Sequence, residues 1–299
     1  MTHRSAPVHH RFSWGVLPLL LAGCSGVPAP TPQAAARTEV MVAVTATMEL
    51  VKFNASQPER IVQRVPVTGL PAGDRLVGLD FRVARGVLYA LSQAGRLYTL
   101  EVASGTLKPV GTGPALALPT GAFGVDFNPA LDRIRVVGPG ALNLRLHPDT
   151  GAQVDYDPAQ PGVQPDGALH YAAGDVNAGQ QPQLVGAAYT YNTRNDKLTT
   201  NYAIDRALGT LAMQGSLEGT EPVVSPNTGA LRTVGSLGLG PLADASFDIS
   251  DVSNTALAAV RTDAHAPTRL YHIDLTNGRA TVLGTVGNGA ALLGIAIEP

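Results

Sequence analysis

The chain has 299 residues, with 21 basic and 23 acidic side chains and a formal net charge of −2 at pH 7. This balance lacks the basic footprint that nucleic-acid-binding proteins need, so no nucleic-acid partner is expected. Charged residues make up only 15%, and 33 glycines and 23 prolines separate short apolar runs. Such a composition predicts a globular, turn-rich fold, and the chain is long enough to bury a core as one all-β domain.

Residues 1–23 have the features of an export signal. Arg4 and Arg11 precede an apolar run, Val16–Ala22, and no acidic residue occurs before Glu39. The run is far shorter than a membrane-spanning helix requires, so it predicts a cleaved signal peptide rather than a stable span. Its removal takes away two basic residues and no acid, which leaves 19 basic and 23 acidic side chains.

Cys24 is the only cysteine, and it directly follows the apolar run. The tetrad Leu21-Ala22-Gly23-Cys24 resembles the lipobox of bacterial lipoproteins. This resemblance implies a diacylglyceryl thioether on Cys24, cleavage before it and acylation of the new amine. Two or more acyl chains hold a protein stably on a membrane. The alternative is an ordinary secretory signal with an incidental cysteine near the cleavage point.

The predicted location is therefore outside the cytoplasm, with the protein lipid-anchored to the cell-envelope membrane. Ser25 follows the cysteine, and the lipoprotein resemblance implies outer-membrane sorting where the envelope is of the Gram-negative type. Residues 24–45 begin with a Pro/Ala-rich stretch and are interpreted as a tether. The folded body is then expected to span residues 46–299.

A six-residue motif recurs along this body. Each copy reads as a strand of alternating apolar residues with a small residue at its second position. Its five copies are Val77–Arg82 (VGLDFR), Phe123–Asn128 (FGVDFN), Val185–Thr190 (VGAAYT), Ala245–Ser250 (ASFDIS) and Leu293–Glu298 (LGIAIE). Further strand patterns and Gly-containing turns follow each of the first four copies. Sequential antiparallel meanders of this period predict an all-β propeller of four-stranded blades.

The two ends of the body predict how the propeller closes. Glu49–Asn54 and Ile61–Val67 read as the third and fourth strands of a blade, whereas Leu292–Glu298 reads as a first strand with nothing after it. Joined, they form one composite blade and bring the count to about five. Six or seven blades remain open if Asp155–Gln183 or Leu217–Val234 holds another blade, and an open β-sandwich is the alternative architecture.

Three stretches carry a resemblance to a known family: VGLDFRVARGVLYALSQAGRLYTLEVASGTLKPVG, GVDFNPALDRIRVVGPGALNLRLHPDTGA and YHIDLTNGRATVLGTVGNGAALLGIAI. In order and spacing they resemble the bacterial family catalogued as domain of unknown function 4394, over about Ala46 to Pro299. The resemblance implies a propeller-like fold in an exported protein. It implies no activity and no active site.

The repeated motif also supplies the main candidate site. Three copies place an aspartate at the same register, Asp80, Asp126 and Asp248, where the other two copies have Ala188 and Ala296. If these strands are innermost, the three carboxylates converge near the central channel. They form a candidate metal site for a hard cation such as Ca²⁺, which oxygen ligands prefer. The alternative is structural: each aspartate accepts hydrogen bonds from backbone N–H groups of its own or the next blade.

No standard catalytic signature is present, so no catalytic residue is assigned and enzymatic activity is left open. Arg82, Arg133 and Arg135 are interpreted as ion-pair partners, and Arg82 would pair with one of the three channel carboxylates. The sequence favours a monomeric binding or scaffold module at the cell envelope, with a protein or small-molecule ligand. The alternative is a lactonase-like, metal-dependent hydrolase that uses the channel carboxylates.

Overall fold

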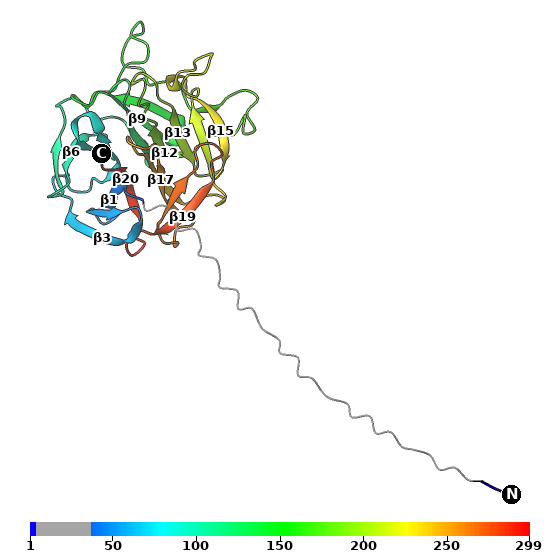
Figure 1. Ribbon diagram of the computed structural model, residues 1–299. Helices are drawn as coiled ribbons and strands as arrows, with labels where there is room; N and C mark the ends of the chain where they lie inside the picture. Colours follow the sequence, from blue (N-terminus) through cyan, green and yellow to red (C-terminus); the bar gives the residue numbers. More distant parts are fainter. Residues whose placement is uncertain (4–36) are drawn as a thin grey trace. The chain divides into compact units, whose positions relative to one another are not determined.

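The computed structural model describes residues 1–3 and 37–299. Cys24, its lipobox and most of the predicted tether lie outside the described residues. Residues 37–299 form one structural unit, drawn in Figure 1 as a ring of small sheets. None of the helices in these described parts is long and apolar enough to span a membrane.

Five separate sheets make up this unit, and each is a blade of a propeller. The first blade consists of β4 (Leu76–Arg82), β5 (Val87–Ser92), β6 (Leu97–Glu101) and β7 (Thr106–Pro109). The second consists of β8 (Gly124–Asn128), β9 (Arg133–Gly138) and β10 (Leu142–Leu146). The third consists of β12 (Leu184–Tyr189), β13 (Asn201–Asp205), β14 (Thr210–Gln214), β15 (Ala230–Ser236) and β11 (His170–Tyr171). The fourth consists of β16 (Asp244–Ile249), β17 (Ala256–Arg261), β18 (Arg269–Ile273) and β19 (Ala280–Thr285).

The fifth, composite blade joins the two ends of the folded unit. It consists of β20 (Leu292–Ile297), β1 (Val40–Thr45), β2 (Glu49–Asn54) and β3 (Gln57–Pro66) in that order. Strand β20 pairs antiparallel with β1, with Val42 opposite Ala296. The second strand of this blade thus lies within the stretch 24–45 that was predicted as a tether, so the folded body starts earlier than the sequence suggested.

The innermost strands close a ring. Strand β4 contacts β8, β8 contacts β12, β12 contacts β16, β16 contacts β20, and β20 contacts β4. The five-bladed propeller predicted from the repeat is confirmed, and the open sandwich is wrong. Neither long interval holds an extra blade: 155–183 contributes only β11, and 217–234 contributes the 3₁₀ turn η3 (Pro226–Thr228) and the start of β15.

The second and third blades depart from four strands. After β10 the chain makes one isolated bridge, between Leu146 and Gln153, and then crosses to the third blade. There β11 pairs in parallel with β15 and becomes a fifth strand. Prolines at 158, 161 and 165 explain the missing fourth strand, because proline donates no ladder hydrogen bond and is excluded from the interior of sheets.

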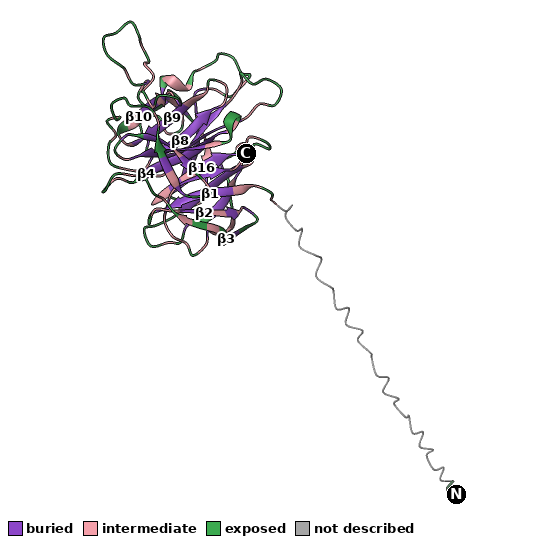
Figure 2. Ribbon diagram, turned by 90° about the vertical axis from the view of Figure 1, so that its left-hand side faces the viewer, coloured by how far each residue is buried: buried purple, intermediate pink, exposed green. Residues whose placement is uncertain are grey.

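The core lies between neighbouring blades, and Figure 2 shows buried residues along the strands and exposed residues in the loops. The small residue of each repeat permits the close approach of the innermost strands. A Cβ added at Gly78 would lie 2.4 Å from Cγ2 of Val125, and one at Gly124 would lie 2.4 Å from the backbone nitrogen of Ala187. Glycine therefore recurs in the motif because each innermost strand packs directly on the next.

Candidate functional site

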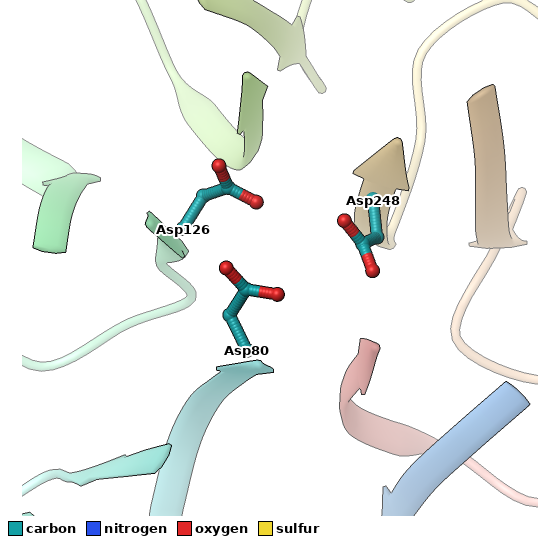
Figure 3. Close-up of side chains that lie close together, drawn as sticks. All are labelled: Asp80, Asp126 and Asp248. Atoms are coloured by element: carbon teal, nitrogen blue, oxygen red, sulfur yellow. The ribbon is translucent and has the colours of Figure 1, made fainter. Parts of the chain in front are cut away.

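The three aspartates of the repeat meet inside the channel. Asp80 on β4, Asp126 on β8 and Asp248 on β16 are 3–6% exposed, and one carboxylate oxygen from each lies within 4.8 Å of the others. Figure 3 shows these three side chains, which we call the carboxylate triad, pointing toward one another. The convergence predicted from their shared register is confirmed.

The triad accepts hydrogen bonds from the channel-facing edges of the innermost strands. Each such strand pairs with its own blade on one edge only, so N–H groups on the other edge have no strand partner. Asp80 accepts from Phe81 of its own strand at 2.7 Å and from Phe127 of the next blade at 2.6 Å. It therefore joins the first two blades.

The other two members of the triad also bind the following blade, and Asp248 in addition binds its own strand. Asp248 accepts from Ile249 of its own strand at 2.6 Å and from Ile297 of the composite blade at 2.5 Å. Asp126 accepts from Tyr189 of the third blade at 2.9 Å. The structural interpretation of these residues is confirmed, since each carboxylate binds the backbone of the following blade.

Three carboxylates are enough for five blades because of their order around the ring. Each innermost strand offers one N–H group, directly after the aspartate or alanine position. Where the preceding blade has Ala188 or Ala296, the N–H group is bound by the aspartate of its own strand, Asp248 or Asp80. All five N–H groups are thus bonded, and only Asp126 has an oxygen for which the structure gives no backbone donor.

Burial disfavours the charged forms of the three carboxylates. Burial raises the pKa of Asp248 to about 7. Burial, and then the charge of Asp248, raises the pKa of Asp80 well above its usual range. Burial and the charges of Asp80 and Asp248 do the same for the pKa of Asp126. A proton held by the triad at neutral pH, or a cation among its oxygens, relieves this repulsion.

The spacing of the triad oxygens fits a bound cation. A cation with Ca²⁺–oxygen distances of about 2.3–2.6 Å at their centre would reach oxygens as far apart as about 5 Å. Each carboxylate oxygen has two lone pairs, so a backbone hydrogen bond leaves one for a metal. The metal role predicted for Asp80, Asp126 and Asp248 remains a prediction.

Tyr191 lies at the end of the channel where the innermost strands end, two residues after β12. Its backbone exchanges two hydrogen bonds of 2.7 Å with the side chain of Asn254 in the fourth blade. A hollow of about 600 Å³ lies here, and we call it the Tyr191 mouth. Arg82 lines it and pairs with Asp132 and with Asp149, at 2.6 Å for the latter. The predicted pairing of Arg82 with a triad carboxylate is therefore wrong, because these loop carboxylates engage its guanidinium.

The two other arginines differ from each other. Arg135 is buried and lies 2.5 Å from Asp166, a residue of the segment that crosses between the second and third blades. It also donates to the hydroxyl of Tyr189 at 3.1 Å, so it attaches that segment to the ring. Arg133 instead donates to the backbone carbonyls of Leu131 and Asp132. Of these two arginines, Arg135 forms the predicted ion pair, whereas no ion pair of Arg133 occurs within residues 37–299.

The opposite end of the channel, where the innermost strands begin, contains two adjoining hollows of about 160 and 350 Å³. Arg206, Gly121 and Ala122 line both of them, and we call the pair the Arg206 mouth. Arg75 and Asp244 line the smaller hollow. Between this mouth and the triad, the small residues of the repeat narrow the channel to a space of about 10 Å³.

The charged side chains of the Arg206 mouth are not paired with each other. Within residues 37–299, none of the ion pairs involves Arg75, Arg206 or Asp244. Arg206 donates to Oε1 of Gln183 at 3.2 Å and to the carbonyl of Ala243 at 3.4 Å. Burial raises the pKa of Asp244, against the lowering effect of the Ala245 N–H and three arginines.

The sequence did not predict this mouth, because its three charged residues do not occupy equivalent positions of the repeat. Arg206 lies in the turn between β13 and β14, whereas Arg75 and Asp244 lie at the starts of innermost strands. The one sequence feature that pointed to this mouth was a charged residue at the start of a repeated strand, as at Arg75 and Asp244.

The fold and the channel define a closed five-bladed β-propeller whose blades are joined at the centre by buried carboxylates. The sequence matches the family described as Domain of unknown function (DUF4394) over residues 49–296, and the chain belongs to this family. The family resemblance found in the repeat is thus confirmed.

Comparisons with other proteins assign no activity to this chain. Among proteins with curated descriptions, none matches this sequence. One similar solved structure is a chain of a nidogen/laminin complex, with 11% identity and a TM-score of 0.47, covering 87% of this chain and 98% of that one. Another is a structural-genomics protein of unknown function from Bacteroides thetaiotaomicron, with 13% identity and a TM-score of 0.46, covering 86% of this chain and 64% of that one. At these identities and TM-scores, neither structure indicates a function for this chain.

Proposed function

We propose that this protein is a binding module held at the cell envelope by a lipid on Cys24, and that it takes a small ligand at the Arg206 mouth. One observation carries the binding role. The charges at the centre of the channel are engaged in holding the blades, whereas those of the Arg206 mouth line two hollows without pairing with each other. Concave sites with a few convergent polar groups are the usual form of ligand pockets.

The Tyr191 mouth is larger but offers less to a charged ligand. Its guanidinium on Arg82 is already bonded to two carboxylates, and the hydrogen bonds of this side chain with Asp132 raise its pKa further. A ligand there would have to displace an ion pair, at a cost that the Arg206 mouth does not impose.

The binding role is tested by melting curves with a set of amino acids, sugar acids, nucleosides and simple carboxylates. A ligand that binds only the folded state raises the melting temperature. Ala122 lines both hollows, so Ala122→Phe should abolish the shift. Ala84→Phe, in the Tyr191 mouth, is the matched control and should retain it. A shift lost only in Ala84→Phe would place the site at the wrong mouth, and no shift with any compound would refute the small-ligand role.

The envelope location rests on the predicted signal and lipobox of residues 1–24. We expect the wild-type chain in the membrane fraction after salt and carbonate washes, and the Cys24→Ser chain in the soluble fraction with an unchanged melting temperature. A Ser variant that stays with the membrane would contradict the lipid anchor.

A second candidate function is a metal-dependent hydrolase, favoured by the spacing of the triad oxygens. Calorimetry with Ca²⁺ and Mg²⁺ should then show binding, and the ion should be required for hydrolysis of a lactone. Asp126→Asn is the appropriate variant, because the amide oxygen still accepts the Tyr189 N–H while one ligand charge is lost. Absence of ion binding at millimolar concentration would leave the triad with its structural role alone.

A further inference from the structure

The Arg206 mouth has a charge arrangement that selects one class of ligand. Arg75, Arg206 and Asp244 line the same hollow of about 160 Å³, and the charges of both arginines act on the Asp244 carboxylate. A ligand that satisfies all three carries a carboxylate and a cation close together. A doubly charged anion such as phosphate would gain from the arginines but be repelled by Asp244.

Two of these three side chains, those of Arg206 and Asp244, are held in place by hydrogen bonds. Arg206 extends from the turn after β13, and its hydrogen bonds to Gln183 and Ala243 leave one terminal nitrogen, Nη2, for which the structure gives no acceptor. Asp244 accepts from the N–H of Ala245 through Oδ1 at 2.9 Å. Its Oδ2 accepts no hydrogen bond from the described residues. One donor and one acceptor are thus available at the hollow before any ligand arrives.

The larger hollow, of about 350 Å³, adjoins the smaller one at Arg206. Its lining is small, apolar or neutral, and includes Pro139, Ala141, Leu184 and Val185 with the amides of Gln181 and Gln183. Among the described residues that line it, Arg206 alone is charged. This hollow suits an uncharged side chain that extends from the charged head group.

We propose that the Arg206 mouth binds a free α-amino acid with an uncharged side chain, its carboxylate on Arg206 and Arg75 and its ammonium on Asp244. The larger hollow then receives the side chain. This assignment rests on the proposed function and names the ligand class of the same site. An α-amino acid places its two charges on one carbon, which matches three groups around one small hollow.

The proposal is tested by calorimetry on the purified full chain with L-leucine, N-acetyl-L-leucine and L-leucinamide as probes. We expect L-leucine to bind. Loss of the ammonium in the first analogue or of the carboxylate in the second should weaken binding at least about tenfold, the scale of one charge-assisted hydrogen bond. L-aspartate and L-lysine, with charged side chains, should also bind more weakly.

Protein variants assign the two ends of the ligand. Arg206→Met should weaken L-leucine binding at least about tenfold while binding of L-leucinamide changes little. Asp244→Asn, which retains the acceptor for Ala245, should weaken L-leucine but not N-acetyl-L-leucine. The analogue series needs no mutation, so a variant that fails to fold leaves the test intact.

Three negative outcomes are distinguishable. If L-leucine and the other amino acids do not bind, but another compound shifts the melting temperature in a way that Ala122→Phe abolishes, the ligand class is wrong and the binding role stands. If neither amino acids nor the wider set bind, both are refuted. Equal binding of L-leucine and N-acetyl-L-leucine would also overturn the proposal, because Asp244 would then recognise nothing.

Discussion

The channel of this propeller has two charged regions that differ in what their charges do. At its centre, the carboxylate triad is buried and bonded to five backbone N–H groups of the innermost strands. At one end, the charged groups of the Arg206 mouth line open hollows and form no ion pair with each other. In this propeller the repeated positions hold the residues that join the blades, while the residues that we propose for a ligand come from unrepeated positions.

The largest expected effect comes from opening the ring. Deletion of Leu292–Pro299 removes β20, its pairing with β1 and the Ile297 N–H that Asp248 binds. Burying Leu292, Ile295 and Ile297 is worth about 1.5–3 kcal/mol each, so about 5–9 kcal/mol is lost as an upper estimate. This loss is comparable to the whole stability of a domain.

We therefore expect the truncated protein to be insoluble or to melt far below the wild type, with a tendency to pair through the exposed strand edge. Melting curves and light scattering check this. A melting temperature within about 3 °C of the wild type, roughly 1 kcal/mol at this size, would contradict ring closure by β20.

The next effect separates the members of the triad. Asp248→Ala leaves two buried N–H groups without a partner, and Asp126→Ala leaves one. At about 1–3 kcal/mol for each unsatisfied group, the losses are about 2–6 and about 1–3 kcal/mol. Denaturant unfolding of both variants checks the order. Equal losses, or a smaller loss for Asp248→Ala, would show that the N–H groups do not determine the role of the triad.

The triad also predicts how stability depends on pH. A carboxyl group whose pKa is raised in the folded state binds more protons there than when unfolded, so stability falls as pH rises between the two pKa values. For Asp248 this window runs from about 4 to about 7. We expect the wild type to lose stability from pH 4.5 to pH 7.5, and Asp126→Asn, with one charge fewer, to lose less.

Denaturant unfolding at the two pH values measures this difference, with Ca²⁺ present and absent at pH 7.5. If Asp126→Asn has the same pH dependence as the wild type, the repulsion described here is not the cause. If Ca²⁺ restores the stability of the wild type at pH 7.5 but not that of the variant, a cation rather than a proton occupies the triad.

The smallest effect on stability is expected at the Arg206 mouth. Arg206 is half-buried and its two side-chain hydrogen bonds are long, at 3.2 and 3.4 Å. Arg206→Met should therefore change the free energy of unfolding by less than about 1 kcal/mol. A change as large as that of Asp248→Ala would show that this mouth is as structural as the centre and would remove the contrast between the two regions.

The sequence predicted the ring and the triad because both repeat. A small residue and an aspartate recur at the positions of Gly78 and Asp80 in the motif, and period-two alternation indicates which residues share a face. The third blade's extra strand was not predictable, since β11 is only two residues long and pairs in parallel with a strand 60 positions away. Val40–Thr45 was missed because its Pro/Ala-rich neighbours suggested a tether.

The site at the Arg206 mouth was out of reach for a related reason. Arg75, Arg206 and Asp244 come from three different blades, and their proximity depends on ring closure rather than on local sequence. Arg82 illustrates the same limit: alternation placed it on the face of Asp80, but its partners are Asp132 and Asp149 in loops of the second blade.

One measurement tests the contrast between the two regions most directly: melting curves of the wild type, Asp126→Asn and Arg206→Met, each with and without saturating L-leucine. The account predicts that L-leucine raises the melting temperature of the wild type and of Asp126→Asn by the same amount and leaves Arg206→Met unchanged. A shift that persists in Arg206→Met and disappears in Asp126→Asn would contradict it, because the ligand would then bind at the carboxylates in the centre of the channel.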